Sequence, residues 1–144
     1  MIIITTQCFA PKIGGIESLM TGMAEAMSNA GNNVLVLADG KKESDDNKKK
    51  YKIIRFDGWK PVRRRRKATY LKQFIKDNKV DAIYADSWKS VEYLNNINSK
   101  LIALAHGTEI PKKYFDSFYG YFNVKKRRIV NSYKNCNIIA ANST

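Results

Sequence analysis

Two glycines between an apolar segment and an amphipathic one mark the first place where chemistry is expected. Gly14 and Gly15 follow residues 2–6, which are apolar and β-branched, and precede residues 16–30, whose apolar side chains recur at helical spacing. Glycine lacks a Cβ, so the backbone can take positive φ and let a ligand come close. The free N–H groups and the dipole of the following helix would face the same loop. This arrangement favours a phosphate site, although the glycines could also serve only to turn the chain.

His106, the only histidine of the chain, is the best candidate for a catalytic side chain. It follows an apolar segment at residues 100–105 and precedes Gly107. A neutral imidazole can exchange hydrogen bonds with a sugar hydroxyl, and an imidazolium can stabilise phosphate charge. Because the residue stands at the end of an expected strand, we expect its side chain to face a cleft. A purely structural histidine is the alternative.

Other polar residues near these two positions are candidates for binding an acceptor. Lys12 could contribute a cation beside the glycines, although exposed lysines are common. Glu17 lies in the first helical turn, where the dipole favours an acid in any case. Glu109 could bind acceptor hydroxyls or simply face solvent. The full set of acceptor-binding candidates is Lys12, Glu17, Asp86, Thr108 and Glu109.

A basic run opens the helix that we expect at residues 63–78. It consists of Arg63, Arg64, Arg65, Arg66 and Lys67. Cations in the first turn oppose the helix dipole, so a bound anion or an anionic membrane surface would compensate them. A solvated basic face is the alternative.

The elements that must position these residues alternate between strand and helix along the whole chain. Short apolar runs, continuous on both faces, are typical of parallel strands covered on both sides. The polar segment at residues 39–50 has little to bury and is expected to be a mobile loop. The fold class predicted is α/β, a Rossmann-like doubly wound parallel sheet in three α/β/α layers with strand order 3-2-1-4-5-6. The expected strands are residues 1–6, 33–38, 52–56, 80–85, 100–105 and 137–141, and the expected helices are residues 16–30, 63–78, 88–96 and 124–135.

Composition places the chain among single globular domains with a strong positive charge. It has 144 residues, 44% of them hydrophobic, and a formal net charge of +13. The charge admits nucleic acid, an anionic membrane surface or an acidic ligand as partners. No apolar run reaches the roughly 20 residues that cross a bilayer, and no signal peptide is evident, so a cytoplasmic protein is expected. The two cysteines, Cys8 and Cys136, are expected to be free thiols.

Several of these segments together resemble a known enzyme family. Residues 9–17 read FAPKIGGIE, residues 106–109 read HGTE, and the segments at residues 81–86 and 138–143 follow in the expected order. The sequence is similar to the GT-B glycosyltransferases, in particular the retaining enzymes of family four. The resemblance implies that residues 1–144 form the N-terminal, acceptor-side domain, with Gly14 and Gly15 near the donor diphosphate and His106 near the transferred sugar.

The resemblance also implies the reaction and its partners. A sugar would pass from a nucleotide-sugar to a saccharide, lipid-linked or other acceptor with retention, in glycan biosynthesis. Peripheral attachment at the inner face of the plasma membrane would suit a lipid-linked acceptor. No cofactor or essential metal is expected. Asp86 departs from the family, which often has histidines in this segment. The donor-binding C-terminal domain is absent from these residues, so we expect them to be inactive alone and to self-associate through an uncovered last strand.

Two alternatives remain open on the sequence. A basic nucleic-acid-binding module would explain the charge and the aromatic residues, but no specific nucleic-acid motif is found, and a salt-dependent gel shift would distinguish it. A dinucleotide oxidoreductase would explain Asp39 after the second strand. The first turn lacks Gly-x-Gly-x-x-Gly, however, and a change in NADH fluorescence on mixing would be needed to support it.

Overall fold

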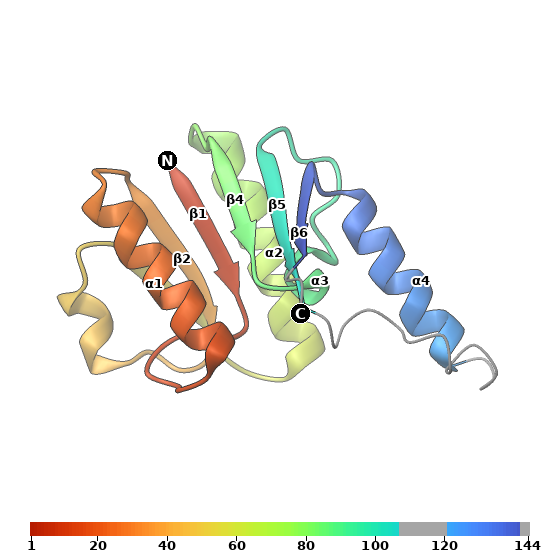
Figure 1. Ribbon diagram of the computed structural model, residues 1–144, viewed down its shortest axis with the longest axis horizontal. Coiled ribbons are helices and arrows are strands. Elements are labelled where there is room, and N and C mark those ends of the chain that lie inside the picture. Colours follow the sequence, from red (N-terminus) through yellow and green to blue (C-terminus); the bar gives the residue numbers. More distant parts are fainter. Residues whose placement is uncertain (107–120, 142–144) are drawn as a thin grey trace.

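The protein folds around a six-stranded, all-parallel sheet with the order β3-β2-β1-β4-β5-β6 (Figure 1). The structure is a computed structural model, and it describes residues 1–106 and 121–141. Both the fold class and the strand order predicted from the sequence are confirmed. The strands are β1 (Ile2–Thr6), β2 (Val34–Asp39), β3 (Lys52–Phe56), β4 (Ala82–Ala85), β5 (Lys100–Ala105) and β6 (Ile138–Ala141).

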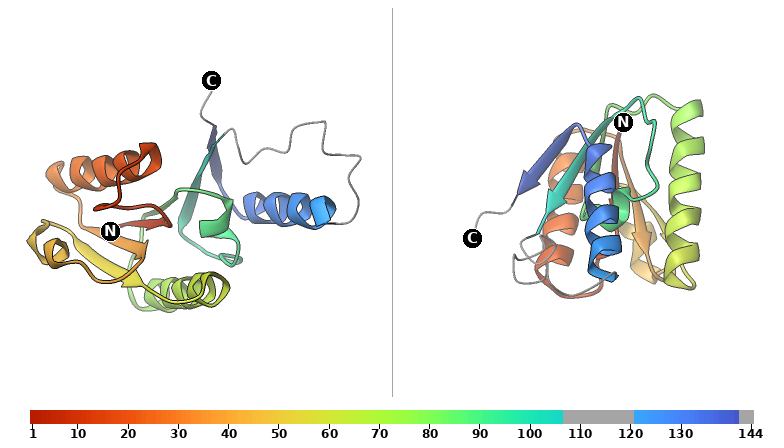
Figure 2. Two further views of the ribbon diagram at one scale, coloured as in Figure 1. Left: turned by 90° about the horizontal axis from the view of Figure 1, so that it is seen from below. Right: turned by 90° about the vertical axis from the view of Figure 1, so that its right-hand side faces the viewer.

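Helices cover the two faces of the sheet and complete the three layers (Figure 2). One face packs against α1, and the other packs against α2, α3 and α4. Alternate residues of one strand therefore enter different cores, as Ile3 and Ile4 do, and both are fully buried. This explains why β1 and β2 are apolar without interruption. The helices are α1 (Gly15–Asn29), α2 (Lys60–Asp77), α3 (Trp88–Val91) and α4 (Tyr121–Lys134), with a 3-10 helix η1 (Ser44–Lys48).

Two helix boundaries differ from the sequence-based expectation. The start of α2 lies at Lys60, three residues before the predicted position, because Pro61 fits the first turn of a helix, where its missing N–H costs nothing. The end of α3 lies at Val91 rather than near residue 96. Asn96 has a φ of 55°, in the left-handed region that asparagine tolerates, so residue 96 lies outside any helix, although α3 already ends before it.

The residues expected on the inner faces of α1 (Ile16, Leu19, Met20, Met23, Met27 and Ala30) and α4 (Ile129, Val130 and Tyr133) are buried or half-buried, except for the exposed Ala30 after the end of α1 and one residue in each helix. Met20 and Ile129 are buried as expected, but Leu19 and Val130 are exposed. Each exposed residue lies immediately beside a buried one, so the contact face is narrower than the apolar pattern suggested. Gly31 has a φ of 86° and follows the end of α1, close to the boundary at residue 30 that the sequence analysis expected.

Residues 39–50 are more ordered than their composition indicated. They contain η1, whose Asp46 carboxylate is buried and receives two hydrogen bonds from Arg55, both at 2.7 Å. Those hydrogen bonds keep the pKa of Asp46 below its usual value. The same guanidinium donates to the carbonyl of Ala10 at 2.6 Å. The expectation of a segment with almost nothing to bury is therefore wrong, because an ion pair fastens it to β3 and to the loop after β1.

The last strand lies at an open edge of the sheet. All four residues of β6 are exposed, and β6 pairs only with β5 among the described strands. Self-association through this edge stays a prediction. Within the described residues, no helix combines the length and the apolar character that a bilayer crossing requires.

Candidate functional site

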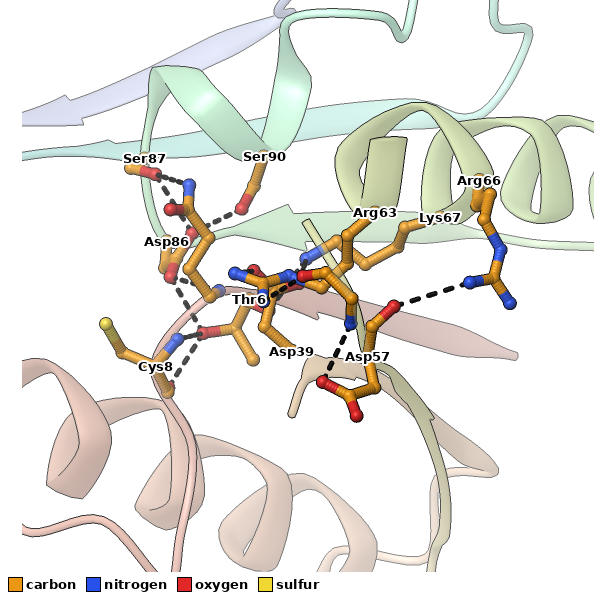
Figure 3. Close-up of polar contacts among 12 residues, drawn as sticks. Thr6, Cys8, Asp39, Asp57, Arg63, Arg66, Lys67, Asp86, Ser87 and Ser90 are labelled. Carbon is orange, nitrogen blue, oxygen red and sulfur yellow. Dashed lines mark hydrogen bonds and ion pairs between the residues drawn. The ribbon is translucent and has the colours of Figure 1, made fainter. Parts of the chain in front are cut away.

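The polar residues of interest lie where the parallel strands end. Because β1 is flanked by β2 and β4, their carboxyl ends bring Thr6, Asp39 and Asp86 to one edge of the sheet. Figure 3 shows these three residues in one continuous polar cluster with side chains from α2 and α3. The loop that carries Gly14 and Gly15 leaves the sheet at this point, so the cluster determines where that loop begins.

Asp86 is buried, and its carboxylate is occupied by hydrogen bonds from the protein. Its Oδ2 accepts from the Thr6 hydroxyl at 2.8 Å and from the Gln7 N–H at 2.7 Å. Its Oδ1 accepts from the hydroxyls of Ser87 at 3.1 Å and Ser90 at 2.5 Å. The side chain is 2% exposed. A carboxylate offers about four accepting positions, so Asp86 holds the strand-to-loop junction instead of presenting free oxygens to an acceptor.

Lys67 holds the same junction from the other side of the cluster. Its ammonium donates to the carbonyl of Thr6 at 2.8 Å and to Oδ1 of Asp39 at 2.7 Å, and the residue is 3% exposed. Burial lowers the pKa of Lys67, and the negative charge of Asp39 opposes that shift. Arg63 adds a second cation, 2.9 Å from Oδ2 of Asp39. The junction is thus fixed by groups from α2 and β2 as well as by Asp86.

The predicted basic patch is divided by this arrangement. Lys67 and Arg63 turn toward Asp39, and Arg64 lies 3.6 Å from the carboxylate of Glu92. Arg65 and Arg66 remain exposed. The expectation of one outward cluster of five charges is therefore corrected, because three of the cations have carboxylate partners inside the fold.

The two glycines use less conformational freedom than the sequence analysis expected. Gly14, the N-cap of α1, has an extended φ of 175°, and Gly15 is not among the residues with positive φ. A Cβ at Gly15 would meet nothing within 4 Å, whereas a Cβ at Gly14 would clash with the carboxylate of Glu17. The space above Gly15 is open, and Glu17 lies beside the helix start. Lys12 is exposed in the same loop.

Cys8 lies in this loop but has the properties of an inert thiol. Its pKa is raised to about 11, mainly by burial and further by the negative charges of Asp86 and Glu17. The thiolate that a nucleophile requires is therefore scarce at neutral pH. Cys136 is also a free thiol, and burial raises its pKa to about 11.

His106 is the first residue after β5, at the same sheet edge as the glycine loop. Its side chain is half-buried, and Nε2 is buried without a hydrogen-bond partner in the described structure. A buried ring nitrogen without a hydrogen-bond partner costs free energy, unless a ligand supplies that partner. Thr108 and Glu109 lie outside the described residues. Residues 1–106 and 121–141 hold no group of three His, Cys, Asp or Glu side chains arranged to bind a metal ion.

Comparison with known proteins decides the family. The sequence model described as Glycosyltransferase Family 4 matches residues 13–144. The chain belongs to this glycosyltransferase family. The matched region includes both glycines and His106, and the parallel sheet agrees with the N-terminal half of a GT-B glycosyltransferase. A search of curated proteins found no match for this family-4 chain.

Proposed function

We propose that this family-4 protein transfers a sugar, with retention, from a nucleotide-sugar to a hydroxyl of a saccharide or lipid-linked acceptor. The described residues would form the acceptor-side domain, and a second domain would bind the nucleotide. The observation that carries the proposal is the family match together with an open glycine loop and His106 at one sheet edge. The free thiols of Cys8 and Cys136 fit a cytoplasmic location.

The glycine loop would act on the diphosphate of the donor. Gly14 and Gly15 begin α1, so the unpaired N–H groups of that helix and its dipole favour negative charge there. The exposed cation of Lys12 lies in the same loop. We propose that these groups stabilise the charge that develops on the leaving diphosphate without an essential metal. Asp86 and Lys67 would act indirectly, by fixing the position from which the loop starts.

The acceptor and the transferred sugar would lie between this loop and the end of β5. The buried Nε2 of His106 would complete its hydrogen bonding with a hydroxyl of the sugar or with phosphate oxygen. Glu17, Thr108 and Glu109 remain proposed acceptor contacts. For Glu17, the position beside Gly14 supports the proposal.

A methyl group at Gly15 is expected to weaken donor binding without harming the fold. In Gly15→Ala the new Cβ points into open space, so stability should be equal or slightly higher. If the diphosphate approaches this backbone, the methyl group obstructs it, and KM for the donor should rise about tenfold, or about 1.4 kcal/mol. Initial rates with varied donor and varied acceptor, together with thermal melts, measure both effects.

Gly22→Ala is the matched control for this substitution. Gly22 also has open space around its Cβ position, but it lies in the middle of α1. Alanine there should stabilise the helix by about 1 kcal/mol and leave KM unchanged. Equal donor KM values for Gly15→Ala and the original protein would refute the proposed role of the loop.

A further inference from the structure

Exposed apolar and cationic side chains share the outer face of α2 at its first two turns. Trp59, the N-cap of the helix, is 74% exposed, and Val62 is 48% exposed. Both are large apolar groups that the fold leaves uncovered. Arg66 follows at the next helical spacing, and Arg65 lies beside it, both exposed. The face combines an aromatic residue, an aliphatic residue and two cations.

The cations of this face are not neutralised by carboxylates of the described structure. The guanidinium of Arg65 lies over the ring of Tyr93 at 5.6 Å, and that of Arg66 donates to the backbone carbonyl of Asp57 at 3.3 Å. No Asp or Glu occurs between residues 58 and 76. The carboxylate of Asp57 accepts the N–H of Gly58 at 2.7 Å. The outer face therefore keeps its positive charge, unlike the inner cations, which pair with Asp39 and Glu92.

We propose that this outer face, formed by Trp59, Val62, Arg65 and Arg66, docks on an anionic lipid surface. Tryptophan favours the headgroup level of a bilayer, and a helix with cations beside apolar side chains lies in that interface. Nucleic acid would also attract the cations, but it gives an exposed aliphatic side chain such as Val62 nothing to bury against. This surface differs from the run of residues 63–67 that the sequence suggested, since Trp59 and Val62 replace the inward-turned cations. The proposal does not depend on the sugar-transfer reaction.

Tryptophan fluorescence with vesicles tests the docking directly. The chain has two tryptophans, and Trp88 is buried, so a change at the exposed one dominates. With phosphatidylcholine vesicles that also contain phosphatidylglycerol, the protein should co-sediment and its emission should shift to shorter wavelength. With phosphatidylcholine alone neither should occur. Trp59→Phe, a substitution at an exposed site, should remove the emission shift.

Charge variants separate the proposed face from general basicity. Arg65→Gln with Arg66→Gln should weaken binding to the anionic vesicles about 25-fold, about fivefold for each cation removed. Lys76→Gln with Lys79→Gln makes the same change in charge, and both lysines are exposed, Lys76 in the last turn of α2 and Lys79 just after it. That control should bind within about twofold of the original protein, because salt screens exposed charges that lie far from the docked face.

The following results would overturn the proposal. One is equal binding by the two double variants, and another is sedimentation with anionic vesicles without any emission shift. A third is failure to bind anionic vesicles while RNA shifts in a gel, which would assign the face to nucleic acid. Circular dichroism of each variant confirms that the fold is retained.

Discussion

Lys67→Met is expected to lower the free energy of unfolding by about 3–5 kcal/mol, a large part of the stability of a domain of this size. The substitution removes the ammonium that binds the Thr6 carbonyl and Asp39, and methionine offers those oxygens no donor. Among the described residues, Asp39 would keep only Arg63 as an ion-pair partner. The converse variant, Asp39→Leu, leaves a buried ammonium without its carboxylate and should cost a similar amount. Urea titrations followed by circular dichroism measure both.

Two further variants show whether burial causes this loss. Arg66→Met removes a cation from the exposed face of the same helix and should change stability by less than about 0.5 kcal/mol. The double variant Asp39→Leu with Lys67→Met removes both charges together, so its cost should be well below the sum of the single costs. If Lys67→Met unfolds at the same urea concentration as the original protein, the ammonium is not held as the structure describes.

His106→Ala is expected to lower kcat about 10- to 1,000-fold, or about 1–4 kcal/mol, while leaving the melting temperature nearly unchanged. The residue stands after β5 at the sheet edge, and its Nε2 has no partner in the described structure. Truncation therefore removes a group that we propose contacts the substrate, and it removes little core packing. Steady-state kinetics of the full-length protein give the change in kcat.

A conservative variant distinguishes hydrogen bonding from packing. His106→Gln keeps a side chain of similar reach that can donate and accept, so it should recover part of the lost kcat. Nε2 is a buried atom without a partner in the described structure, and such an atom lowers the stability of the fold. The alanine variant should therefore be free of this small cost in folding free energy. Collapse of stability with normal activity would show that His106 is structural.

The sheet was predictable because its signal is local. Uninterrupted apolar runs such as β1 and β2 are typical of parallel strands covered on both sides, and Gly31 ends α1 through its own backbone. The end of α3 at Val91 was not predictable from apolar spacing, because Leu94 beyond it is also buried in the core.

The polar cluster at the sheet edge was not predicted, because its partners are far apart in sequence. Lys67 and Asp39 are separated by 28 positions, and Asp86 and Thr6 by 80. The sequence did contain a signal that the side chain of Lys67 points inward. Lys67 lies four residues before the buried Leu71, so helical spacing places both side chains on the inner face of α2. The prediction of one outward basic patch did not take this spacing into account.

The open position at Gly15 and the unpaired ring nitrogen of His106 are also properties of three-dimensional packing. Residue type indicated the positions, but only the fold shows that a Cβ at Gly15 would be free and that Nε2 lacks a partner in the described structure. These two features make the positions useful for experiments, because substitutions there change the site and spare the core.

Sugar transfer by the full-length protein is the measurement that tests the central claim most directly. The protein is incubated with a panel of nucleotide-sugars and with saccharide and lipid-linked acceptors, and the product is analysed by mass spectrometry and by NMR of the new anomeric carbon. We expect one donor to lose its sugar to an acceptor, with release of the nucleoside diphosphate and with the anomeric configuration of the donor retained. Inversion of that configuration, or binding of RNA or NADH with no transfer from any donor, would contradict the account.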